Sequence, residues 1–186
     1  MRAKSISGVF AALLLVLSIG CSQNKASVAD VKDHVSHALD NAGLKDISVD
    51  VNNDKELVTL KGDVKTQQEK ERAEQIAKES AGGYIVSNEI GVRPEGMESK
   101  AEKIDSNVDS AIEKDFKAVL MANQLDNQRI KYSAKNGVLT LKGKVDDMAL
   151  REKAENLAAG VPNVQQVVNE LDVKGGKRNP GTKPAP

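Results

Sequence analysis

Residues 57–64 read LVTLKGDV and residues 138–145 read VLTLKGKV, so one eight-residue pattern occurs twice in the chain. The two copies lie 81 positions apart. The same offset aligns residues downstream of the pattern without an insertion: Glu71, Ala73, Glu74 and Ala77 meet Glu152, Ala154, Glu155 and Ala158. Chance amphipathic patterns would not keep one register over so long a stretch, so the sequence predicts a duplicated module.

Each copy predicts the same order of helices and strands. Apolar residues follow helical spacing at the start of a copy, as in Val31, Val35 and Leu39 of the first. A short alternating strand follows, near residues 47–51 and 130–134, and a turn leads into the repeated pattern. A second helix and a last alternating strand, near residues 86–92 and 167–173, complete the copy. We therefore expect an α+β fold of two tandem α-β-β-α-β modules, each with two helices on one face of a three-stranded sheet.

A capping residue marks the start of the second helix in each copy. Thr66 followed by Glu69 forms a capping-box pattern, and Asp147 is the equivalent cap in the second copy. The repeat places the modules at residues 28–93 and 105–173, with a polar linker at 94–104 and a basic Pro- and Gly-rich tail at 174–186. Modules of this size bury only about 60% of their unfolded surface, so packing of one on the other would stabilise both.

The N-terminus reads as an export signal. Arg2 and Lys4 precede an apolar run at residues 9–17, which is shorter than a membrane span of about 20 residues. The following Ser-Ile-Gly-Cys sequence at 18–21 resembles the lipobox of bacterial lipoproteins. That resemblance implies cleavage after residue 20, lipid on Cys21 and a short tether over 21–27. The alternative is a secreted protein with a spare cysteine, since Cys21 is the sole cysteine. Ser22, which is not Asp, favours the outer membrane by the same resemblance.

The patterns VTLKGDV and LTLKGKV, each followed by a capped helix and by V-x-N-E at residues 86–89 or 167–170, resemble the BON domain. The glycine of the pattern, Gly62 or Gly143, is the hallmark of that family. Such a glycine inside a strand usually marks a bulge or a close backbone approach, which we expect to be to a helix. The resemblance implies non-enzymatic roles at bacterial envelopes. Members with two BON domains include osmotically induced periplasmic proteins and outer-membrane lipoproteins that bind anionic phospholipid.

The resemblance also implies where a membrane would be contacted. In the phospholipid-binding relatives, contact is made by the first helix of the second module, here from about Ser106 to Ala122. Its polar positions are mixed in charge: Asp109, Glu113, Lys114, Asp115 and Lys117. Lys114 and Lys117 are candidate contacts, and the tail cations Lys174, Lys177 and Arg178 offer a second electrostatic contact. Phe116 aligns with Val35 and is expected in the core.

Other chemistry has little support in the sequence. Basic and acidic residues balance at 27 each and aromatic residues are few, which argues against nucleic-acid binding and aromatic-lined ligand pockets. His34 and His37, with Asp30 and Asp33, share a helix face that could hold a metal only with a second element, and the second copy lacks the histidines. We expect no catalytic residues, cofactor or metal.

The predicted function is therefore that of a lipid-anchored envelope protein. Its two modules would bind a membrane surface, anionic phospholipid or envelope proteins, and support envelope integrity or stress tolerance. The alternative is a soluble periplasmic osmotic-stress protein without an anchor.

Overall fold

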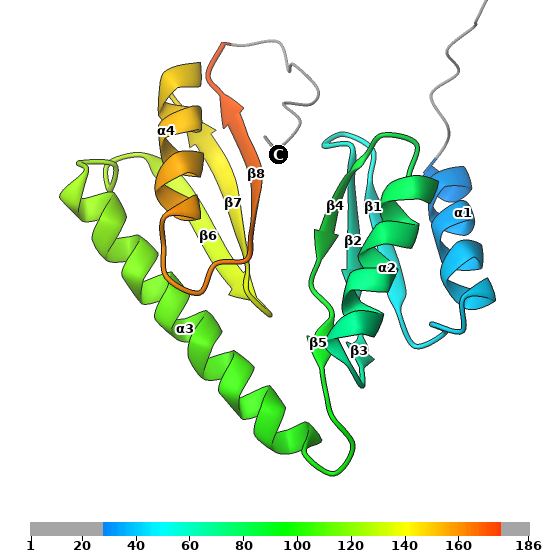
Figure 1. Ribbon diagram of the computed structural model, residues 1–186. Coiled ribbons are helices and arrows are strands. Elements are labelled where there is room, and N and C mark those ends of the chain that lie inside the picture. The colour runs from blue at the N-terminus through cyan, green and yellow to red at the C-terminus, as the bar shows by residue number, and fades with distance from the viewer. Residues whose placement is uncertain (1–27, 176–186) are drawn as a thin grey trace, which may run out of the picture.

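The computed structural model describes residues 28–175, so Cys21, Lys177 and Arg178 lie outside the described part of the chain. Two modules of the same topology stand side by side (Figure 1). The predicted α+β fold with two α-β-β-α-β repeats is confirmed. No helix within residues 28–175 combines the length and the apolar character that a membrane crossing requires.

The first module runs from α1 (Val28–Asn41) to β5 (Gly91–Val92). Its sheet has the order β1-β2-β4, with β1 (Ser48–Asn52) antiparallel to β2 (Leu57–Lys61) and β4 (Ile85–Asn88) parallel to β2. Short β3 (Asp63–Val64) pairs with β5 and prolongs β2 and β4. Helix α1 and α2 (Gln67–Ser80) cover one face of the sheet. Their apolar sides meet it in a core that includes Val35, Leu39, Val58, Leu60, Ala73 and Ala77.

The second module repeats this order with longer elements. It comprises α3 (Glu98–Ala122), β6 (Arg129–Lys135), β7 (Val138–Val145), α4 (Met148–Ala159) and β8 (Gln166–Val173), in a sheet of order β6-β7-β8. Phe116 is fully buried, which confirms its predicted place in the core. Its ring meets that of Tyr132 edge to face, with centroids 5.1 Å apart.

Helix α3 is longer than the repeat predicts. It begins at Glu98, so most of the linker predicted at residues 94–104 is helical. Glu, Ala and Lys dominate residues 98–103, and these residues favour helix even on an exposed surface. The turn around Gly96 is the actual connection. The Gly96 amide donates to Glu98 Oε1 at 2.9 Å.

The predicted helix caps are both present. Thr66 Oγ1 accepts from the Glu69 amide at 3.2 Å, and Glu69 Oε2 accepts from the Thr66 amide at 3.0 Å. Asp147 Oδ1 accepts from the Leu150 amide at 2.8 Å. These contacts satisfy amides that the first turn of a helix otherwise leaves unpaired, and they confirm both predicted starts.

The two hallmark glycines adopt the same strained backbone. Gly62 has φ of 127° and Gly143 has φ of 121°, a region that side chains rarely adopt. A Cβ at Gly62 would overlap the carbonyl oxygen of Asp46, and one at Gly143 would overlap that of Arg129. The close approach is therefore to the chain at the start of the first strand. The expected approach to a helix is wrong, because the nearest atoms belong to residues 46–47 and 129–131, which are in no helix.

The open faces of the two sheets are turned toward each other, with the helices outside (Figure 1). A small apolar seam of Leu57, Ile85, Val138 and Val168 joins them where β4 lies beside β8. The Gln166 side chain pairs with the exposed edge of β4: its Nε2 donates to Val86 O at 2.6 Å and its Oε1 accepts from the Asn88 amide at 3.1 Å. This side chain replaces a strand partner for β4 and holds the modules together.

Candidate functional site

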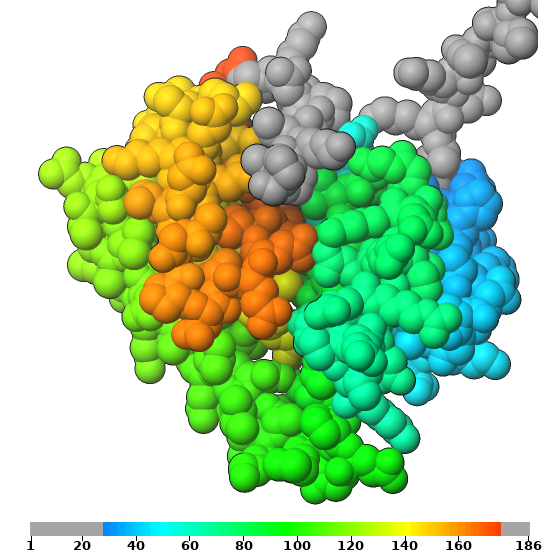
Figure 2. Space-filling view, viewed as in Figure 1, coloured from blue at the N-terminus to red at the C-terminus, as the bar shows by residue number. Residues whose placement is uncertain are grey.

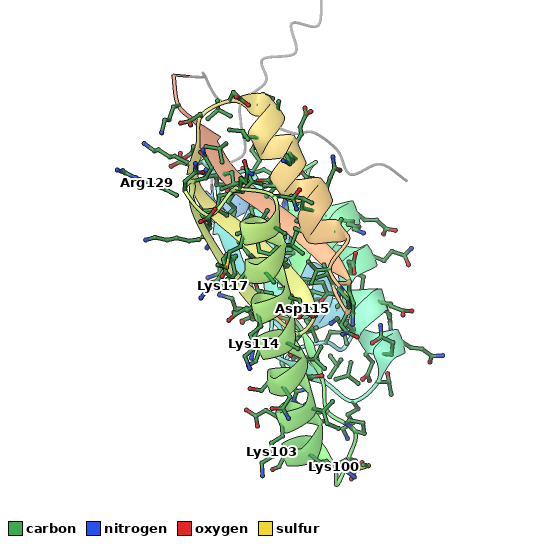
Figure 3. The ribbon with its side chains drawn as sticks, turned by 90° about the vertical axis from the view of Figure 1, so that its left-hand side faces the viewer. Lys100, Lys103, Lys114, Asp115, Lys117 and Arg129 are labelled. Atoms are coloured by element: carbon green, nitrogen blue, oxygen red, sulfur yellow. The ribbon has the colours of Figure 1, made fainter. Side chains whose placement is uncertain are left out.

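The outer side of α3 carries two pairs of cations, one near its start and one in its second half. Lys100, Lys103, Lys114 and Lys117 are all exposed, and they are called the cationic face below. Figure 3 shows these lysines along the helix, on the side of the molecule opposite to the first module. Exposed Ile104 and Met121 lie among them, with 53% and 58% of their surfaces accessible. The face therefore combines ammonium groups with isolated apolar side chains.

Three carboxylates of α3 are engaged by neighbouring residues. Asp105 forms an ion pair with Arg93. Asp109 is buried and accepts from the backbone amides of Asn136 and Gly137 at 2.9 and 3.1 Å, which fixes the turn between β6 and β7. Glu113 Oε1 accepts from the Ala134 amide of β6 at 2.9 Å.

The other carboxylates of the helix, Glu98, Glu102 and Asp115, are exposed. The structure thus engages three of the carboxylates of α3, namely Asp105, Asp109 and Glu113, and leaves the four lysines exposed. The predicted contacts Lys114 and Lys117 belong to the cationic face. Lys174 forms an ion pair with Asp146 beyond the end of β8 and is not part of that face.

A polar cavity of about 280 Å³ lies between the open faces of the two sheets. Equivalent residues of the two copies line it in pairs: Thr59 with Thr140, Lys61 with Lys142, and Glu89 with Glu170. Lys142 forms an ion pair with Glu170 at 3.3 Å, and Lys61 pairs with Asp50 at 2.6 Å. The two lysines of the cavity are therefore neutralised by carboxylates of their own modules.

Glu89 is the partly buried carboxyl of this cavity. Burial raises its pKa, while Lys61, Lys142 and Lys135 and the Ser87 hydroxyl act in the opposite direction. The Lys61 ammonium holds the pKa of Asp50 below its ordinary value, chiefly through their hydrogen bond. The cavity can hold water or a small polar molecule, but apart from Leu57 its lining offers little apolar surface.

The model of the BON domain matches residues 27–94 and 108–175, in register with the two modules. The chain belongs to the BON-domain family. It is 31% identical over 137 residues to Osmotically-inducible protein Y of Escherichia coli (strain K12), and the match covers 73% of this chain and 67% of that protein.

Two solved structures of CdsD, a structural protein of the type III secretion system of Chlamydia trachomatis, are also similar. One match has 15% identity, a TM-score of 0.30 and covers 77% of this chain, and this chain spans 61% of that chain's length. The other, to the C-terminal domain, has 12% identity, a TM-score of 0.31 and covers 80% of this chain and 99% of that chain.

The Asn of the BON V-x-N-E pattern has a structural role. Asn88 Nδ2 donates to Lys70 O and to Glu74 Oε2, each at 3.1 Å, which ties β4 to α2. Asn169 Nδ2 makes the equivalent contacts with Arg151 O at 3.3 Å and Glu155 Oε2 at 2.8 Å. The V-x-N-E pattern marks the family in the sequence, but it does not reveal these contacts with the helix.

Sequence reasoning also missed half of the cationic face. Lys100 and Lys103 fell in the predicted linker, although their three-residue spacing, shared by Lys114 and Lys117, is typical of one helix side. His34 and His37 of the first BON module are exposed on α1. Over residues 28–175 there is no group of three His, Cys, Asp or Glu side chains placed to hold a metal ion.

Proposed function

We propose that this protein is a non-enzymatic, lipid-anchored bacterial envelope protein whose second BON module docks on anionic phospholipid. The main support for this proposal is the cationic face of α3. Four lysines are exposed there, while Asp105, Asp109 and Glu113 of the same helix are engaged with the module. Each Lys near an anionic leaflet contributes about 1 kcal/mol of attraction.

The lipobox and the cationic face complement each other. A single acyl chain binds a membrane only marginally, with an association constant of about 10⁴ M⁻¹, so stable attachment needs a second chain or a basic surface. Lipid on Cys21 would hold the protein at the envelope. The cationic face would then orient it, with α3 toward the headgroups and Ile104 and Met121 reaching between them. Support of envelope integrity would follow from this attachment.

Vesicle flotation tests the docking surface. The probe is the chain from residue 21 onward with Cys21→Ser, mixed with phosphatidylglycerol vesicles or with phosphatidylcholine vesicles. We expect binding to the anionic vesicles alone, and a loss of about tenfold or more for Lys114→Glu with Lys117→Glu. Lys32→Glu with Lys45→Glu is the matched control, because both lysines are exposed on the first module. Equal binding to both vesicle types would contradict the proposal.

A soluble osmotic-stress protein without an anchor is the second candidate. The similarity to Osmotically-inducible protein Y favours it. Mass spectrometry of the mature N-terminus separates the two. Acyl groups on Cys21 support the lipoprotein, whereas an unmodified Cys21 or cleavage at another residue supports the soluble protein.

A further inference from the structure

The open face of the second sheet carries a cluster of cations that the fold does not require. Arg129 and Lys131 point outward from β6, and Lys142 and Lys144 do so from β7. The strand register places Arg129 opposite Lys144 and Lys131 opposite Lys142. These four residues, all exposed, are called the cation ladder.

Such an arrangement is unfavourable in a sheet. Like charges directly opposite each other on neighbouring antiparallel strands repel and destabilise the pair. The first module shows that the fold does without them. The register there is shifted by two residues, so that Ser48 lies opposite Lys61 and Asp50 opposite Thr59. No two cations oppose each other on these strands, and the Lys61 ammonium contacts the Asp50 carboxylate at 2.6 Å.

The neighbouring carboxylates neutralise only part of the cation ladder. Glu170 of β8 pairs with Lys142 at 3.3 Å. Asp172 is engaged by Lys55 of the first module at 2.6 Å. Within residues 28–175 no ion pair involves Arg129, Lys131 or Lys144. Three of the four cations, Arg129, Lys131 and Lys144, are thus exposed without an ion pair among the described residues.

We propose that the cation ladder binds a lipid headgroup that carries two phosphates. The side chains form a two-by-two grid, with about 5 Å between opposite residues and about 7 Å between successive ones on a strand. Two phosphates joined by a glycerol bridge match such a grid, one phosphate to each cross-strand pair. Arg129 adds a guanidinium that can hold a phosphate through two hydrogen bonds.

The position of the cation ladder fits a bilayer that already meets α3. Helix α3 packs on one face of the sheet and the cation ladder lies on the other, but β6 is the outer strand, so the two surfaces meet along its edge. Figure 3 shows Arg129 on the same side of the molecule as Lys114 and Lys117. This inference rests on the proposed membrane docking and adds a preferred lipid class to it.

The test compares lipids at equal surface charge. The probe is again the unlipidated chain from residue 21, with vesicles that contain either cardiolipin or twice as much phosphatidylglycerol. We expect wild-type binding to be about fivefold to tenfold tighter with cardiolipin, as one added multivalent contact of this kind would give. Lys131→Gln with Lys144→Gln should bring this ratio to about one while binding to phosphatidylglycerol persists.

The matched control is Lys114→Gln with Lys117→Gln, which should weaken binding to both vesicles and leave the ratio unchanged.

A wild-type ratio near one, or a ratio that survives Lys131→Gln with Lys144→Gln, would overturn the inference but not the docking. Absence of binding to either vesicle would overturn both. Tight binding of soluble glycerol bisphosphate without a vesicle preference would assign the cation ladder to a free solute and reject the lipid. Circular dichroism of each variant checks that the fold is intact.

Discussion

The two modules share one backbone plan and differ in the charges that they place on it. Residues 28–92 contain eight Lys and Arg against 13 Asp and Glu, whereas residues 98–175 contain 12 against 13. At equivalent positions the first module has Asp33, Asp50 and Asp63 where the second has Lys114, Lys131 and Lys144. Buried residues and the strand glycines therefore set the fold, and outward positions are free to differ. Figure 2 shows the modules in contact as one body, so the difference in charge lies within a single particle.

The largest effect is expected from a substitution of the strand glycine that both modules share. Gly143→Val forces a side chain onto a backbone of φ 121° and into the Arg129 carbonyl, so we expect it to destabilise the second module by about 3 kcal/mol or more. Denaturant unfolding followed by circular dichroism measures this. Gly160→Ala is the control, because Gly160 has a helical φ of −83° and a Cβ there would make only an ordinary contact, 3.6 Å from Leu157 O, so it should change stability by about 0.5 kcal/mol or less. Similar losses for both variants would contradict the role of Gly143.

A smaller difference should separate the two Asn residues. Asn88 is only 3% exposed, whereas Asn169 is half-buried, although both make the same contacts. Replacement of the Asn by Ala leaves the hydrogen-bond acceptors without a donor, and the site in the first module is more deeply buried. We therefore expect Asn88→Ala to lower the free energy of unfolding by about 2 kcal/mol and Asn169→Ala by about 1 kcal/mol. Thermal unfolding of the two variants compares them. A larger loss for Asn169→Ala would show that burial does not set the difference.

We expect the cation ladder to destabilise the folded protein. Replacing Lys131 and Lys144 by Gln removes one cation from each opposed pair, so we expect the protein to gain about 0.5 to 1 kcal/mol at low salt. The gain should shrink as salt screens the repulsion. Thermal unfolding at low and high salt measures both effects. Lys61→Gln in the first module, which removes the partner of Asp50, should not stabilise the protein.

The smallest expected effect concerns Glu89. Burial raises its pKa in the folded protein, so the folded state holds the proton more tightly than the unfolded chain does. Stability from this group is present at low pH and falls as pH rises from the unfolded to the folded pKa. Glu89→Gln should therefore be more stable than wild type above that window, by roughly 1 kcal/mol or less, and match it at pH 4. Parallel melting curves at pH 4 and pH 8 would show this, and identical pH dependences would refute it.

Much of the fold follows from the sequence because its determinants are local or repeated. Thr66, Asp147 and the helical spacing around Phe116 each act over a few residues, and the 81-residue offset supplied a second copy as a check. The neighbour of Gly62 could not be found in this way, since the Asp46 carbonyl is brought to it by tertiary packing.

The candidate site was predicted less completely. The residues of α3 are mixed in charge when only the sequence is considered. The sequence does not show that Asp109 and Glu113 accept hydrogen bonds from the backbone of β6 and its turn. The start of α3 at Glu98, which adds Lys100 and Lys103, was hidden by a polar stretch that resembled a linker. The opposition of Arg129 and Lys144 required the strand register.

In the proposed docking, the second module meets the membrane through α3 while the first module does not. Ala118 of α3 and His37 of α1 occupy equivalent positions, and both are exposed. With Cys21→Ser as background, an environment-sensitive fluorophore on Ala118→Cys or on His37→Cys reports which module enters the headgroup layer. With anionic vesicles we predict a blue shift and gain of intensity for the probe at 118 and none for the probe at 37. Equal responses, or a response at 37 alone, would contradict the account.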